Sequence, residues 1–287
     1  MSSPWDLHAH SAASDGTLSP AGLVRRAAAR GVRVLALTDH DTTAGLAEAA
    51  ATAEAEGVEL VPGVELSTAW EGVEVHVVGL WIDPAHPALQ AGLERQRRSR
   101  LERARAMGER LARAGIPGAY EGARALAGGE VVNRSHFARF LVASGHGRDL
   151  AQAFGRYLQR GRPGYAPPSW VPLAEGIGWI RAAGGVAVLA HPGRYRLSGG
   201  RLRRLVAAFR GAGGEAIEVV SGSHGPAQMH VAAGLARRFG LLASVGSDFH
   251  VPGNPWRELG RLDPLPDGCV PVWEARSGPA LLAEAGP

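Results

Sequence analysis

Lysine is absent from the sequence, and cysteine is nearly so. All 31 basic residues among the 287 are arginines, and with 27 acidic residues the formal net charge is +4. This charge is weaker than the basic stripe of a protein that coats duplex nucleic acid, although it is compatible with a small anionic substrate. The single cysteine, Cys269, excludes an internal disulfide and any zinc finger built on several cysteines, which fits a reducing compartment.

Long apolar runs are also missing. No stretch reaches the roughly 18 apolar residues that a membrane span requires, and the first residues lack the basic region and apolar run of a signal peptide. We therefore expect a soluble, cytoplasmic protein without a membrane partner. A hydrophobic content of 45% over 287 residues suffices for one large domain, with or without an insertion. The sequence indicates no oligomeric state.

What the sequence does contain is an alternation of short apolar runs with amphipathic segments. This is the pattern of βα units and favours an α/β barrel or a doubly wound sheet. Ser19-Pro20 is a helix start, and Gly31 is a helix stop after a helical segment at 21–30. The further expected helices are 42–56, 173–183, 200–212 and 227–239, and the expected strands are 32–37, 58–61, 63–68, 73–80, 186–190, 216–220 and 241–245.

This alternation of strands and helices stops in the middle of the chain. No strand is expected between 84 and 162, where an arginine-rich helix at 88–114 precedes shorter helical segments at 120–126, 136–144 and 150–159. We therefore predict a barrel domain made of 1–83 and 166–287 and an inserted helical subdomain at 84–165. The arginine run at 95–113 is interpreted as the solvated face of the long helix, with an RNA-attracting surface as the alternative.

Metal-binding side chains recur where the predicted strands end. His8 and His10 are two residues apart, so in a strand both point to the same side. Comparable side chains stand at or just beyond later strand ends: His40, Glu65, His76, His191, Asp248 and His250. Because the carboxyl ends of parallel strands meet on one face, these residues are predicted to form one metal site at or just beyond the strand ends.

The same residues resemble the PHP (polymerase and histidinol phosphatase) domain family. The motifs are DLHAHS at 6–11, SDG at 14–16, LTDHD at 37–41, PGVE at 62–65, AHPGRY at 190–195 and GSDFH at 246–250, together with His76. The resemblance implies a distorted (β/α)7 barrel with an inserted helical subdomain and a trinuclear metal site. It implies that one metal is held by His8, His10, Glu65 and Asp248, a second by Asp15, His40 and His250, and a third by Glu65, His76 and His191. Every expected ligand is present.

The donor types constrain the ions and the reaction. Imidazole suits Zn²⁺, Fe²⁺ or Mn²⁺, and carboxylates move the preference toward Mn²⁺, so we expect three divalent ions, with Mn²⁺ first and Zn²⁺ or Fe²⁺ as alternatives. Clustered divalent ions suit phosphate ester hydrolysis, because they activate water and offset charge on the leaving oxygen. The predicted catalytic residues are Asp15, His40, Glu65, Asp248 and His250. Asp39 and Asp41 are expected to orient His40.

The insertion is expected to supply substrate contacts. Arg134 offers a forked donor suited to phosphate, and His136 can donate a proton or a hydrogen bond, although both could simply be solvent-facing residues at a helix start. Arg194, beside His191, and His224, just past a strand, are also predicted to bind substrate. Tyr165 either stacks on a base or fills the joint between the two domains.

Within the family, the length, the insertion after His76 and the AHPGRY motif most resemble the branch that hydrolyses nucleoside 3′,5′-bisphosphates such as pAp. Members of that branch remove the 3′-phosphate and leave a nucleoside 5′-monophosphate, and some also trim short RNA or DNA from the 5′ end. We therefore predict a metal-dependent phosphatase whose partner is a small phosphorylated nucleotide or a short oligonucleotide. The alternatives are a histidinol phosphatase and, from another class, a PHP module that binds metal or ligand without catalysis.

Overall fold

The structure, a computed structural model, describes residues 3–127 and 131–275, so residues 1–2 and 276–287 of the predicted barrel domain lie outside the described chain. Within it, the strands form one sheet in the order β1-β2-β3-β4-β6-β7-β8, with β5 beside β3. The strands are β1 (Trp5–Ala9), β2 (Val34–Leu37), β3 (Glu59–Trp70), β4 (Val73–Leu80), β5 (Val171–Pro172), β6 (Val186–Leu189), β7 (Ala216–Ser221) and β8 (Leu242–Gly246).

The sheet curls into a nearly closed barrel. Its first and last strands meet through a bridge between Ala9 and Phe249, and the backbone N–H of Asp248 donates to the carbonyl of His8 at 2.9 Å. A side chain at Gly246 would lie 2.3 Å from Cβ of His8, so this approach requires glycine. All pairings are parallel except those of β4, which is antiparallel to both β3 and β6. The predicted distorted α/β barrel is confirmed.

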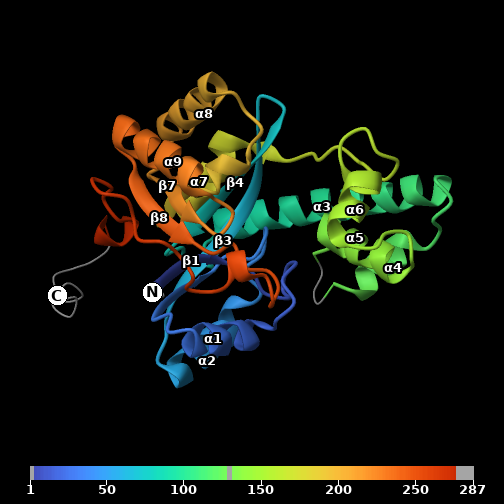
Figure 1. Cartoon of the computed structure of the whole chain (residues 1–287), viewed down its shortest axis with the longest axis horizontal. Helices are drawn as coiled ribbons and strands as arrows, with labels where there is room; N and C mark the ends of the chain where they lie inside the picture. The colour runs from blue at the N-terminus through green and yellow to red at the C-terminus, as the bar shows by residue number, and fades with distance from the viewer. Residues whose placement is uncertain (1–2, 128–130, 276–287) are drawn as a thin grey trace.

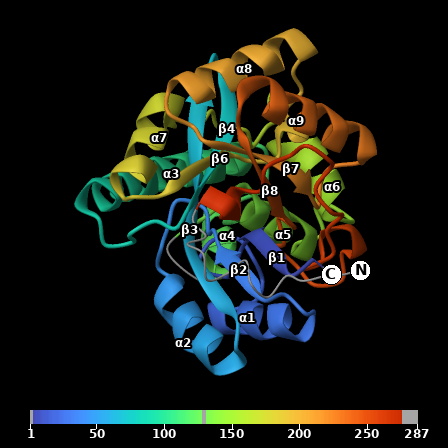
Figure 2. The ribbon, with the colours of Figure 1, turned by 90° about the vertical axis from the view of Figure 1, so that its left-hand side faces the viewer.

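Five helices cover the outside of the strands: α1 (Pro20–Ala29), α2 (Leu46–Glu56), α7 (Leu173–Ala182), α8 (Gly199–Gly211) and α9 (Pro226–Phe239). Figure 2 shows them around the sheet, with α1 and α2 on one side and α7, α8 and α9 on the other. The first begins as predicted, because Ser19 Oγ accepts a hydrogen bond from the N–H of Gly22 at 3.0 Å. None of the described helices is long and apolar enough to cross a membrane.

Between β4 and β5 the described chain is helical and lies to one side of the barrel (Figure 1). It consists of α3 (Pro87–Arg113), α4 (Ala119–Ala125), α5 (Arg134–Ala143), α6 (Leu150–Ala153) and the π-helical turn η1 (Phe154–Leu158). These helices share an apolar core of their own that includes Leu111, Phe137 and Leu158. The N-terminal half of α3 packs on the barrel, where a side chain at Gly92 would lie 2.4 Å from the Trp179 ring.

Four predicted elements, two strands and two helices, differ from the observed ones. The strands expected at 58–61 and 63–68 form the single strand β3, because Pro62 falls where β3 changes partner from β2 to β4 and its missing N–H breaks neither ladder. The helix expected at 42–56 begins only at Leu46, since Thr42 Oγ1 accepts from the N–H of Ala44 at 3.2 Å and forms a turn. The helix expected at 150–159 continues beyond Ala153 as the π-helical turn.

Candidate metal centre

Nine predicted metal ligands lie together at one end of the barrel. Six are imidazoles and three are carboxylates: His8, His10, Asp15, His40, Glu65, His76, His191, Asp248 and His250. The prediction that all lie at or beyond strand ends is wrong for Glu65 and His76, which lie inside β3 and β4. The reason is that the β3–β4 hairpin extends past the point where β2 ends, so both side chains still reach the barrel mouth.

Glu65 is at the middle of this cluster. Its Oε2 lies 3.2 Å from Nε2 of both His8 and His10 and 3.1 Å from Nδ1 of His40. Its Oε1 lies 2.9 Å from Nδ1 of His76 and 3.0 Å from Nε2 of His191. Burial alone would raise the pKa of this carboxyl, but the surrounding imidazoles hold the pKa well below its usual value. One ionised carboxylate therefore contacts five histidines.

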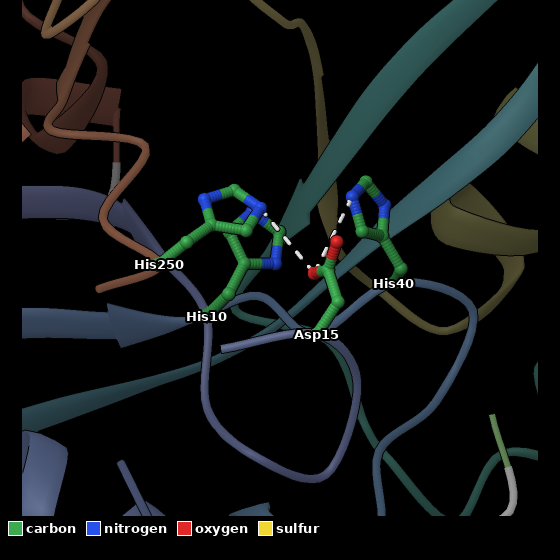
Figure 3. Close-up of side chains that lie close together, drawn as sticks. All are labelled: His10, Asp15, His40 and His250. Atoms are coloured by element: carbon green, nitrogen blue, oxygen red, sulfur yellow. Dashed lines mark ion pairs between the residues drawn. The ribbon is translucent and has the colours of Figure 1, made fainter. Parts of the chain in front are cut away.

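Asp15 forms a second group with His10, His40 and His250 (Figure 3). Its Oδ1 lies 3.3 Å from Nε2 of His250 and 4.0 Å from Nε2 of His40. The loop that carries Asp15 turns tightly, because a side chain at Gly16 would lie 2.4 Å from the carbonyl oxygen of His10. The carboxylate of Asp15, shortly after β1, therefore lies near His40, which follows β2, and His250, which follows β8.

Asp248 completes the cluster from the loop after β8. Its Oδ1 lies 3.5 Å from Nε2 of His10, and its Oδ2 accepts a hydrogen bond from Arg194 at 2.7 Å. Asp248 and His191 have φ angles of 53° and 28°, in the left-handed region that residues other than glycine rarely adopt. Such strain concentrates at functional sites, where surrounding structure holds the backbone in place.

The donor set fits divalent metal ions. Nε2 of His8 and Nε2 of His10 are 3.1 Å apart and face the same oxygen of Glu65. Within the described chain, Glu65 Oε2 and Asp15 Oδ1 are buried without a hydrogen-bond partner. Lone pairs of imidazole nitrogens and carboxylate oxygens that converge in a buried space are what a divalent cation coordinates. The protein therefore carries the side chains for divalent metal binding.

Sequence reasoning missed Glu218, which supports two of these ligands. Its Oε1 lies 3.0 Å from Nδ1 of His8, and its Oε2 accepts a 2.6 Å hydrogen bond from the backbone N–H of His191. A carboxylate that binds the second nitrogen of a metal-binding histidine fixes the ring orientation and raises its basicity. The available signal was an ionisable residue inside the buried strand expected at 216–220, where a charge is costly without a partner.

The expected role of Asp39 and Asp41 is wrong, because the observed hydrogen bonds of both carboxylates go to other groups. Asp39 accepts from Ser11 Oγ and Ser14 Oγ, each at 2.6 Å, and so holds the loop that leads to Asp15. Asp41 accepts from Arg100 Nε at 2.7 Å and therefore joins the barrel to α3.

A cavity of about 180 Å³ opens between the metal-binding cluster and the inserted helices. Besides the ligands, four arginines line it: Arg100, Arg103, Arg134 and Arg194. The interpretation of the arginine run as a solvated face is wrong for Arg100 and Arg103, which are buried and whose guanidinium groups lie 4.8 Å and 5.3 Å from the Trp170 ring centroid. It holds for Arg95 and Arg98, whose side chains are exposed.

The five predicted substrate-binding residues divide into two groups. Arg134 and Arg194 line the cavity, while the other three are not among the lining residues. His136 is buried, and its Nδ1 accepts from the N–H of Asn133 at 3.0 Å in a capping box. His224 uses both ring nitrogens on the backbone, at Gly193 N and Val219 O. Tyr165 is half-buried, and no hydrogen bond of its side chain is seen in the described chain.

Known proteins match both the sequence and this fold. The PHP domain profile matches residues 6–153. The chain is 52% identical to a 3′,5′-nucleoside bisphosphate phosphatase of Chromobacterium violaceum, covering 93% of this chain and 94% of the relative, and 49% identical to the 5′-3′ exoribonuclease Rnm of Escherichia coli, covering 98% and 96%. A solved structure of an amidohydrolase from Chromobacterium violaceum, with bound sulfate and no metal, superposes with a TM-score of 0.91 at 50% identity and covers 94% of both chains. The chain belongs to the PHP domain family.

Proposed function

We propose that the protein is a divalent-metal-dependent phosphoesterase that removes the 3′-phosphate of nucleoside 3′,5′-bisphosphates such as pAp and releases the nucleoside 5′-monophosphate. The same site would shorten 5′-phosphorylated oligonucleotides from the 5′ end, since an internal phosphodiester then takes the place of the 3′-phosphate. The names of the bisphosphate phosphatase and exoribonuclease relatives support this substrate class, and neither points to histidinol phosphate.

The observation that carries the proposal is a cavity with two different sides, one with the donors of metal ions and one with cationic side chains. One side is the histidine and carboxylate cluster. On the other, Arg103 Nη2 and Trp170 Nε1 are buried and, within the described chain, have no hydrogen-bond partner. Burial lowers the pKa of Arg103 only to about 10, so the guanidinium stays charged at neutral pH. An unpaired buried donor is costly, and a second phosphate on the substrate would satisfy it.

The residues of the two sides take different roles. Bound divalent ions would activate water and offset charge on the leaving oxygen. Glu218 holds the His8 ring and the backbone of His191 in position, and Ser135 holds Asp15 through a 2.8 Å hydrogen bond to Oδ2. Arg103 and Arg134 are assigned to the 5′-phosphate, so that binding energy remote from the reacting ester positions it.

We assign three ions to this centre, with Mn²⁺ as the first choice and Zn²⁺ or Fe²⁺ as alternatives. The described chain has three groups of donors, and within each group the ligand atoms lie within 4.8 Å of one another: one around Asp15, one of His8, His10 and Glu65, and one of His40, Glu65 and His76. Glu65 belongs to two of these groups, and since its two oxygens face different histidines it would be able to hold two ions. The family grouping differs in giving the third ion His191 instead of His40, and Nε2 of His191 also contacts Glu65.

The helical insertion at 84–165 is proposed as the part that selects the substrate, because α3 and α5 contribute Arg100, Arg103 and Arg134 to the cavity. The test is hydrolysis of adenosine 3′,5′-bisphosphate, adenosine 3′-monophosphate and histidinol phosphate by the purified protein with Mn²⁺. Adenosine 3′-monophosphate has no 5′-phosphate to accept these charged hydrogen bonds. We therefore expect its kcat/KM to be about ten- to a hundredfold lower than that of the bisphosphate. Equal rates on the two nucleotides, or a preference for histidinol phosphate, would refute the proposal.

A further inference from the structure

One tryptophan differs from the other six in its environment. Trp256 is 75% exposed, whereas Trp5, Trp70, Trp81, Trp170, Trp179 and Trp273 are buried or half-buried. It is also the most exposed of the large hydrophobic residues in the described chain. An indole this exposed takes no part in the apolar core and is free to contact a ligand.

The position of Trp256 is beside the metal-binding cluster. It lies in the loop after β8, six positions beyond the candidate ligand His250, and the guanidinium of its neighbour Arg257 lies 3.4 Å from Oδ2 of Asp248. Its carbonyl oxygen packs against the loop after β7, because a side chain at Gly222 would lie 3.1 Å from it. Two loops at the barrel mouth therefore fix the backbone of Trp256, while its ring remains exposed.

The surroundings of the ring favour a nucleic-acid ligand. The guanidinium of Arg261 lies 5.8 Å from the Trp256 ring centroid. Arg257 and Arg194 both approach Oδ2 of Asp248, so cationic groups extend from the cavity toward this segment. An exposed aromatic ring flanked by arginines is the arrangement with which proteins bind single strands, through base stacking and attraction of the backbone phosphates.

Trp256 itself does not line the cavity, which Arg103 and Trp170 bound on the insertion side and Asp248 and Arg194 on the barrel side. A bisphosphate substrate ends at the metal-binding cluster. An oligonucleotide continues beyond it, because a further nucleoside is attached to the scissile phosphate. We propose that Trp256 is a stacking platform for the base of this next nucleotide and that Arg257 and Arg261 attract the following phosphate. This inference rests on the proposed function and assigns a subsite that only oligonucleotides occupy.

The experiment compares three substrates in the unsubstituted protein and in Trp256→Ala: adenosine 3′,5′-bisphosphate, the 5′-phosphorylated dinucleotide pApA, and a matched 5′-phosphorylated dinucleotide without a base at its second position. Stacking on an aromatic side chain contributes enough binding free energy that its loss should lower kcat/KM for pApA by about tenfold. The bisphosphate and the abasic dinucleotide should change less than about twofold, and Trp256→Phe should restore most of the pApA activity.

A fluorescence measurement of substrate binding, which needs no turnover, accompanies the kinetic comparison. A phosphorothioate dinucleotide that resists cleavage should quench tryptophan fluorescence in the unsubstituted protein and clearly less in Trp256→Phe. Equal losses on all three substrates, or an unchanged rate on pApA, would overturn the inference. So would a change of oligomeric state in Trp256→Ala without a change in the rate on pApA, since the ring would then be a protein contact.

The proposed function and this inference fail in different ways. If the unsubstituted protein hydrolyses the bisphosphate but not pApA, the stacking subsite is refuted and the phosphatase proposal stands. If it hydrolyses neither, both are refuted.

Discussion

Ser135, the second residue of α5, donates a 2.8 Å hydrogen bond to Oδ2 of Asp15, a candidate metal ligand of the barrel. Arg139, one turn further along the same helix, donates to the backbone carbonyl of Asp15. The inserted helices therefore do more than border the cavity. They also hold Asp15, a candidate metal ligand, in place through two hydrogen bonds from α5.

Ser135→Ala should weaken metal binding and lower kcat, because partners of this kind typically contribute about ten- to a hundredfold in affinity or activity. Metal titration and steady-state kinetics measure the two effects. Ser144→Ala is the matched control, since Ser144, the C-cap of α5, donates only to backbone carbonyls of that helix, those of Phe140 and Leu141. If Ser135→Ala binds metal as tightly as the control does, the hydrogen bond to Asp15 has no functional role.

Glu65→Gln should remove more metal than loss of any single histidine, because this carboxylate contacts five imidazoles and is shared by two of the donor groups. Glutamine keeps the shape of the Glu65 side chain and removes its negative charge. Metal content per protein molecule is the measurement, with Glu59→Gln, an exposed position of the same strand, as the control. Full occupancy of three ions in Glu65→Gln would show that the carboxylate does not bridge.

The sequence predicted the metal-binding cluster well for a physical reason. The alternation of short apolar strands with helices predicts mainly parallel strands whose carboxyl ends meet on one face, and the resemblance to the PHP family added Asp15 and the grouping of the ligands. The prediction of a solvated face was wrong for Arg100 and Arg103, because the periodicity of α3 does not reveal which of its faces meets the barrel. That choice depends on remote contacts, such as Asp41 with Arg100 and Trp179 with Gly92. His136 occupies the place of the usual Glu or Gln in its capping box, and its role in substrate binding stays a prediction.

Arg134→Ala should lower kcat/KM for the bisphosphate by about ten- to a hundredfold and should affect p-nitrophenyl phosphate much less. The reason is that a guanidinium group that binds the second phosphate can act only on a substrate with two phosphates. Arg148→Ala, at a side chain that is 80% exposed, is the control. Equal losses on both substrates would place Arg134 at the transferred phosphate, and no loss on either would make it a surface arginine.

Asp41→Asn should destabilise the protein by about 3–5 kcal/mol, because it leaves the buried guanidinium of Arg100 without its counter-charge. Arg100 Nη2 lies 2.5 Å from Asp41 Oδ2, and both side chains are less than a tenth exposed. The ion pair of Arg95 with Glu175 joins the same helix to the barrel at the surface, so Glu175→Gln should cost less than about 1 kcal/mol. Chemical denaturation of both variants tests this, and equal free energies of unfolding would contradict it.

The proposed function specifies which of the two phosphates of a nucleoside 3′,5′-bisphosphate is removed. The direct measurement is chromatographic identification of the nucleoside monophosphate formed from adenosine 3′,5′-bisphosphate by the Mn²⁺-loaded protein. With the 5′-phosphate held by Arg103 and Arg134 and the 3′-phosphate at the metal-binding cluster, the predicted products are adenosine 5′-monophosphate and inorganic phosphate. Formation of adenosine 3′-monophosphate, or no release of phosphate at all, would contradict the account.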